Sequence, residues 1–195
     1  MGRFLYLAAF AYMGVCLYAL EMRPASAIAI PHRPVDPGSA LTAGPEWFAQ
    51  VRGRCNPVEV DVAMRATPPP AGFDGTAFQG ACYALAGRIG EARQVIGSLP
   101  EAQRGQAAGI LLSIADPVAD AGDDRAAGPM MRLVLEFVPE NYIALFHAGM
   151  SEYALGETDA ARLHLEHFLR VYTERDGFFA RATEVLARLK AGEGG

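Results

Sequence analysis

Two histidines in the sequence have a spacing that suits a shared metal ion. His164 and His167 are three residues apart in "HLEH" and would lie on one face of a helix, while His147 precedes them. A zinc site needs a third or fourth ligand, and partners that orient each ligand. The sequence shows none beside this pair, so we interpret these histidines as solvated or partly packed.

A second group that could bind a cation is acidic. It consists of Asp116, Asp120, Asp123 and Asp124. Carboxylates bind hard cations, but these residues lack the alternating oxygen ligands and distal glutamate of a calcium loop. We interpret them as an acidic helix end and turn, and the sequence predicts no metal site.

The usual signatures of catalysis are also missing from the sequence. No glycine-rich phosphate loop follows a strand, no Cys-x-x-Cys occurs, and "HLEH" is not the metalloprotease spacing. The sequence therefore predicts no catalytic residue, no cofactor and no enzymatic activity. From Pro45 onward acidic residues outnumber basic ones, and the net charge of the chain is −5, which disfavours a nucleic-acid partner.

The elements that would position any site begin after an apolar N-terminus. Residues 4–20, "FLYLAAFAYMGVCLYAL", are uncharged and lie at the short end of the length needed to span a bilayer. We expect residues 1–23 to be a retained membrane anchor with a cytoplasmic N-terminus, or a signal peptide cleaved after Ala27. Lipid attachment at Cys16 is a weaker alternative, because Val15 fits lipoprotein processing poorly. Residues 24–45 are rich in proline and predict a semi-extended linker.

Residues 46–191 carry an internal repeat, and residues 192–195 are expected to form a disordered tail. Four glycines stand 34, 35 and 34 residues apart: Gly53, Gly87, Gly122 and Gly156. A small residue stands seven positions before each of the last three: Gly80, Ala115 and Gly149. Large apolar residues follow nine positions after the same glycines: Ile96, Met131 and Leu165. Small residues at a crossing let two helices approach closely, and large ones fill the space around it.

This pattern resembles the tetratricopeptide repeat, a pair of antiparallel helices about 34 residues long. The resemblance implies an all-α fold: a solenoid of about three to four helix pairs, closed by a helix at residues 176–190 and preceded by the N-terminal transmembrane or signal helix. An irregular helical bundle is the alternative. Pro117 is expected to kink its helix or to end it early.

The resemblance also places Cys55 and Cys82 near each other in adjacent repeats. A disulfide between them would require an oxidising compartment. Two separately buried thiols are the alternative.

By the same resemblance, the first helices of the repeats would line a concave partner-binding face. Its expected residues are Leu112, Asp116, Asp120, Ile143, Phe146, Met150 and Tyr153, with Ala77, Ala81, Ala84 and Leu85 from an earlier repeat. The linker or the closing helix could instead cover much of this face.

These features predict a membrane-tethered, non-catalytic scaffold. We expect it to bind other protein subunits of a bacterial inner-membrane assembly, to contact the bilayer through residues 4–20, and to place its helical domain in the periplasm. A signal-cleaved, soluble periplasmic adaptor is the main alternative. An enzyme or metal-binding protein of unfamiliar type is the weakest.

Overall fold

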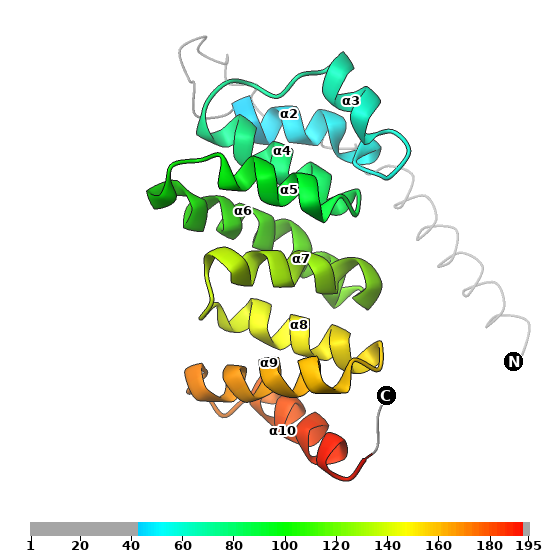
Figure 1. Ribbon diagram of the computed structural model, residues 1–195, viewed down its shortest axis with the longest axis vertical. Helices are drawn as coiled ribbons and strands as arrows, with labels where there is room; N and C mark the ends of the chain where they lie inside the picture. The colour runs from blue at the N-terminus through cyan, green and yellow to red at the C-terminus, as the bar shows by residue number, and fades with distance from the viewer. Residues whose placement is uncertain (1–42, 193–195) are drawn as a thin grey trace, which may run out of the picture. The chain divides into compact units, whose positions relative to one another are not determined.

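The computed structural model describes residues 43–192 of the 195-residue chain. These residues form nine α-helices and one short 3-10 helix, with no strand among them, which confirms the all-α prediction for this part of the chain (Figure 1). The elements are α2 (Ala43–Val51), η1 (Arg52–Arg54), α3 (Val60–Ala66), α4 (Phe73–Leu85), α5 (Ile89–Gly97), α6 (Glu101–Asp120), α7 (Asp124–Phe137), α8 (Tyr142–Ala154), α9 (Thr158–Val171) and α10 (Gly177–Lys190). The expected anchor at residues 4–20 and most of the expected linker lie outside the described residues.

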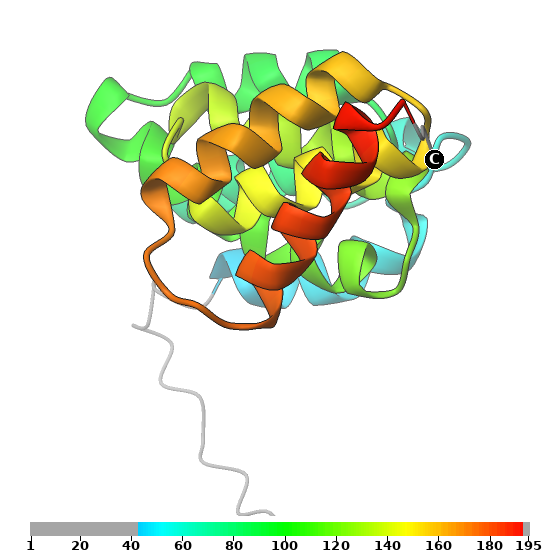
Figure 2. The ribbon, with the colours of Figure 1, turned by 90° about the horizontal axis from the view of Figure 1, so that it is seen from below.

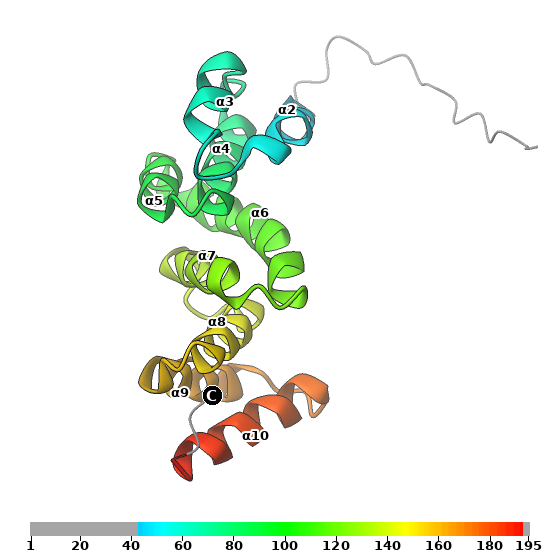
Figure 3. The ribbon, with the colours of Figure 1, turned by 90° about the vertical axis from the view of Figure 1, so that its right-hand side faces the viewer.

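The helices from α4 to α9 stack in chain order as three consecutive hairpins. Helices α4 and α5, α6 and α7, and α8 and α9 pack against each other within the hairpins, and α4 packs on α6 while α7 packs on α8 between them. The side view shows α5, α7 and α9 along one side and α4, α6 and α8 beside them (Figure 3). The stack is therefore two helices deep.

The three hairpins have the same type of turn between their helices. Gly87, Gly122 and Gly156 have left-handed backbones, with φ of +72°, +78° and +77°. In each case the amide of the following residue donates to a carbonyl five residues back, as in Arg88 to Tyr83. This is the Schellman arrangement that ends helices at glycine, and it explains why glycine recurs at this position.

Small residues at the helix crossings also recur. A Cβ on Gly80 would lie 2.7 Å from Cγ1 of Ile96, and a Cβ on Gly149 would lie 2.6 Å from Cγ of Leu165. The two contacts occupy the same register of the first and last hairpins. Close approach of paired helices is thus built in the same way at both ends of the stack.

Three details differ from the sequence predictions. Gly53 lies inside η1 and does not adopt the left-handed backbone of the later turn glycines. Helix α6 does not end at Pro117 but continues through it to Asp120. The amide of Ala121, just after the helix, donates to the Pro117 carbonyl. Residues 43–45, expected in the linker, already belong to α2, because proline is tolerated in the first turn of a helix.

Both ends of the stack are closed by further helices. Helix α2 packs on α4, and α10 lies against α9 and α8 (Figure 2). Asn56 accepts from the amides of Val58 and Glu59 in the turn before α3. In α10 the buried residues are Ala182, Val185, Leu186 and Leu189. Phe179 of the same helix is half-buried beneath Arg175, whose Cζ lies 3.9 Å from the ring centroid.

Candidate functional site

A pocket of about 170 Å³ opens where the C-terminal end of α6 meets α8, α9 and the start of α10. Its wall is aromatic on one side and carries carboxylates and an imidazole on the other. The lining residues are Asp116, Asp120, Tyr142, Ile143, Phe146, His147, Phe168, Tyr172 and Phe178. Concave pockets with an apolar wall and a few converging polar groups are the usual form of a binding site.

The aromatic wall has a buried floor and an exposed rim. Phe168 is 1% exposed and Phe146 8%, whereas Tyr142 and Phe178 at the rim are 47% and 49% exposed. The ring of Phe146 meets Phe178 edge-on at 5.0 Å between centroids, and Phe168 stacks on Tyr172 at 4.7 Å. These contacts fix the floor while leaving two large rings available to a ligand.

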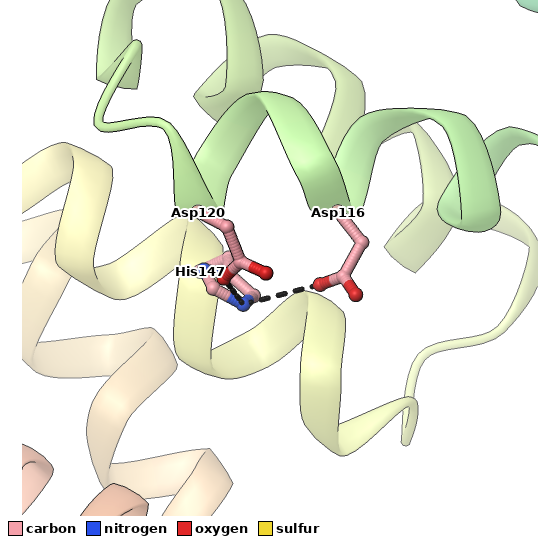
Figure 4. A group of neighbouring side chains, drawn as sticks. All are labelled: Asp116, Asp120 and His147. Carbon is pink, nitrogen blue, oxygen red and sulfur yellow. Dashed lines mark ion pairs between the residues drawn. The ribbon is translucent and has the colours of Figure 1, made fainter. Parts of the chain in front are cut away.

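The polar wall comes from two helices. Asp116 and Asp120 are four residues apart on α6, so both carboxylates reach the same side, and His147 on α8 points toward them (Figure 4). The Nε2 atom of His147 lies 3.2 Å from Oδ1 of Asp116 and 3.9 Å from Oδ1 of Asp120. The imidazole side chain is 11% exposed, and the two carboxylates are 38% and 69% exposed.

The start of α10 is held by a hydrogen-bonded carboxylate. Asp176 caps the helix by accepting from the amides of Phe178 and Phe179, and the Tyr172 hydroxyl donates to its other oxygen at 2.6 Å. The bond from Tyr172 is the main cause that lowers the pKa of Asp176, and the same bond raises the pKa of Tyr172. This arrangement fixes Phe178 at the pocket rim.

Four of the residues expected on the partner-binding face line this pocket: Asp116, Asp120, Ile143 and Phe146. Leu112, Met150 and Tyr153 do not; Leu112 packs against the core of the preceding hairpins, and the other two pack against the core of the last one. Phe146 is covered by Phe178 of the closing helix, as the alternative of a partly covered face implies.

In the first hairpin the corresponding face of α4 is covered by α2. Ala77, Ala81 and Ala84 were expected on the partner-binding face, but they are at most 2% exposed within the core that includes Trp47 and Phe48 of α2. Their expected role is therefore wrong. Alanine side chains leave room for α2 to pack directly on α4.

Several residues that line the pocket were not predicted from the sequence. Tyr142 stands one turn before Phe146, and His147 one turn after Ile143, so helical spacing from the predicted residues could have suggested both. Tyr172 and Phe178 lie at and beyond the end of the last repeat, where no periodicity points to a pocket. His147 was grouped with His164 and His167, but the structure sets it beside the aspartates of α6 instead.

His164 belongs to a different cluster around a buried carboxylate. Glu152 is fully buried, and its side chain lies 2.7 Å from Nδ1 of His164 and 3.2 Å from Nη1 of Arg132. Arg132 also reaches Glu157 at 3.4 Å. A buried charge that is fully paired in this way ties α7, α8 and α9 together and is a structural feature.

Cys55 and Cys82 form a disulfide, with Cα atoms 5.0 Å apart. The bond connects the segment between η1 and α3 to α4, the first helix of the first hairpin.

The chain was compared with known proteins at three levels. No family model matches it, and no curated protein and no solved structure matches it either. Within residues 43–192, no helix combines the length and the apolar character needed to cross a bilayer.

Proposed function

We propose that this protein is a non-catalytic scaffold of tetratricopeptide-repeat type, tethered to a bacterial inner membrane and binding another protein subunit through the pocket between α6 and α10. The observation that carries the proposal is the exposed aromatic rim of Tyr142 and Phe178 above a fixed aromatic floor. Exposed aromatic side chains around a preformed hollow are typical anchors of protein–protein recognition.

The recurrence of one turn and one crossing contact supports the repeat assignment. The register of Gly87, Gly122 and Gly156 repeats every 34 or 35 residues, and the same left-handed turn recurs at each. Repeat scaffolds of this kind work by presenting extended surfaces to other proteins. In the proposal, an apolar side chain of the partner enters the pocket, and its neighbouring residues run along α6 and α8.

The disulfide supports a location outside the cytoplasm. Disulfides persist in oxidising compartments such as the bacterial periplasm. Together with the apolar segment at residues 4–20, this favours an N-terminal anchor with the helical domain on the periplasmic face of the inner membrane. A signal-cleaved, soluble periplasmic adaptor that uses the same pocket is the second candidate, favoured by the Ala-x-Ala site that ends at Ala27.

The two candidates differ in the N-terminal residue and in the partners of the native chain. We would place an affinity tag after Gly195, extract membranes of the native cells in mild detergent, and determine by mass spectrometry the N-terminal residue and the co-purifying proteins. The proposal expects residues 4–20 to be retained and membrane subunits to be present in stoichiometric amounts. A soluble chain that begins at Ile28 and carries no stable partner would contradict it.

A further inference from the structure

The polar wall of the pocket holds three metal-ligating groups from two helices. Asp116 and Asp120 on α6 and His147 on α8 each offer one atom, and these three atoms lie within 4.8 Å of one another. From the sequence, the aspartates and the histidine were considered as two separate groups of candidate ligands. The packing of α6 on α8 brings them together.

The distances are close to those of a coordinated ion. Zinc binds imidazole nitrogen and carboxylate oxygen at about 2.0–2.2 Å, so two ligands of a tetrahedral ion are about 3.3–3.6 Å apart. The Nε2 atom of His147 lies 3.2 Å from one carboxylate oxygen and 3.9 Å from the other. All three atoms lie within 4.8 Å of one another. The Asp120 side chain is 69% exposed and free to rotate, whereas the imidazole of His147 is 11% exposed.

The charges near the end of α6 favour a bound cation. Two carboxylates four residues apart repel each other, and both lie near the C-terminal end of a helix, where the dipole disfavours negative charge. The last turn of α6 contains no basic residue, and none of the nine described residues that line the pocket is Lys or Arg. The repulsion between the two carboxylates is a cost that a bound cation would offset.

The ligand set indicates the class of ion. Calcium and magnesium prefer oxygen ligands alone, whereas an imidazole beside carboxylates suits divalent first-row transition metals. From these observations we infer that Asp116, Asp120 and His147 form a binding site for one such ion, with zinc as the representative case. Three protein ligands leave a fourth position open toward the pocket.

The test uses the full-length chain with a histidine-free tag after Gly195, purified in mild detergent, stripped with EDTA and titrated with Co²⁺ and then with Zn²⁺. Co²⁺ reports its own coordination through visible absorption bands. We expect one Co²⁺ per chain, displaced by Zn²⁺ but not by a large excess of Mg²⁺, and a rise in Tm when Zn²⁺ is added.

Matched variants assign the ligands. His147→Ala and Asp120→Asn should lose the Co²⁺ spectrum and the Zn²⁺-dependent rise in Tm, whereas His167→Ala and Asp159→Asn should retain both. Asp120 is 69% exposed and asparagine has its shape, so this variant stays informative even if His147→Ala fails to fold. The inference is overturned if the wild-type chain binds neither ion, if Asp120→Asn binds as tightly as wild type, or if His167→Ala loses the ion.

This test needs no partner protein and measures no partner binding. A chain that binds no metal would leave the scaffold proposal standing, and a chain without partners would leave the metal site standing. The two proposals can therefore fail separately.

Discussion

The first and last hairpins of the stack share a backbone plan but differ in what their inner faces carry. Ten residues before the turn glycine stands Ala77 in the first hairpin and Phe146 in the last. Ala77 is fully buried, and α2 packs on its helix, with Phe48 of α2 meeting Phe78 of α4 at 5.3 Å. Phe146 instead forms part of the pocket floor and contacts Phe178 of α10.

The comparison links the side-chain volume at this position, ten residues before the turn glycine, to whether the face of the hairpin is covered by another helix or lines a pocket. A methyl group lets another helix cover the face completely. The phenyl ring of Phe146 contacts Phe178 of the closing helix and lines the hollow beside it. The same backbone unit thus serves as core at one end of the stack and as a candidate binding site at the other.

The two hairpins are also stabilised by different means. A disulfide holds the first, and the paired, buried Glu152 holds the last. This difference suggests changes that would affect one end of the stack and leave the other intact.

The largest expected effect is removal of the disulfide. The double variant Cys55→Ser/Cys82→Ser frees a loop with a sequence separation of 27 residues. In the loop-entropy model this lowers the free energy of unfolding by about 3–4 kcal/mol. Thermal unfolding followed by circular dichroism should show a fall in Tm on the order of 10 °C. A reducing agent should destabilise the wild-type chain and leave the variant unchanged; equal Tm values would refute the disulfide's role.

A slightly smaller effect is expected at the other end. Glu152→Ala removes the buried partner of Arg132 and His164 and leaves a cavity, which should cost about 2–3 kcal/mol because Arg132 can still reach solvent. Urea unfolding measures this loss. Glu157→Gln is the matched control, since Glu157 is half-exposed and should contribute less than about 1 kcal/mol. If both variants lose the same stability, the buried cluster does not hold the last hairpin.

The shared crossing can be tested in both hairpins at once. Gly80→Ala and Gly149→Ala would each press a methyl group into a neighbouring side chain, and overpacking of this kind costs about 1–3 kcal/mol. Gly109→Ala in α6 is the control: its Cβ would meet nothing within 4 Å, so the helix should gain about 0.5–1 kcal/mol. Urea unfolding should show a lower free energy of unfolding for Gly80→Ala and Gly149→Ala and a higher one for Gly109→Ala. Stabilisation by Gly149→Ala would disprove the close crossing.

The smallest effect concerns pH and the capping of α10. Hydrogen bonds lower the pKa of Asp176 in the folded chain, so the carboxylate stabilises the fold above its unfolded pKa of about 3.9. That contribution is lost as the pH falls through the folded pKa. Asp176→Asn keeps a helix cap but cannot ionise, so its Tm should lie below that of wild type at pH 7, and the gap should shrink below about pH 4. A gap that stays constant from pH 7 to pH 3 would show that the charge is irrelevant.

The parts of the structure that depend on local geometry were the ones open to prediction from sequence. The left-handed turns at Gly87, Gly122 and Gly156 are set by a few adjacent residues. Gly53 has the same spacing, but its segment folds into a 3-10 helix, which shows that spacing alone does not define a turn.

Features that depend on packing between helices far apart in the sequence were harder to predict. The burial of Ala77 required knowing that α2 covers α4, and the pocket required knowing where α10 places Phe178. The approach of His147 to Asp116 depends on how closely α6 and α8 pack and in which register. The periodicity of the sequence does not determine either.

The most direct test of the account is whether the pocket holds the partner. We would tag the full-length wild-type chain and two variants, Phe178→Ser at the pocket rim and Leu163→Ser, which is 64% exposed and lines a different hollow. Each would be isolated from native membranes, and the co-purifying proteins would be quantified by mass spectrometry. The account predicts that wild type and Leu163→Ser retain the same stoichiometric partner and that Phe178→Ser, folded by circular dichroism, loses it. Equal retention by both variants would show that the partner binds elsewhere and would contradict the central claim.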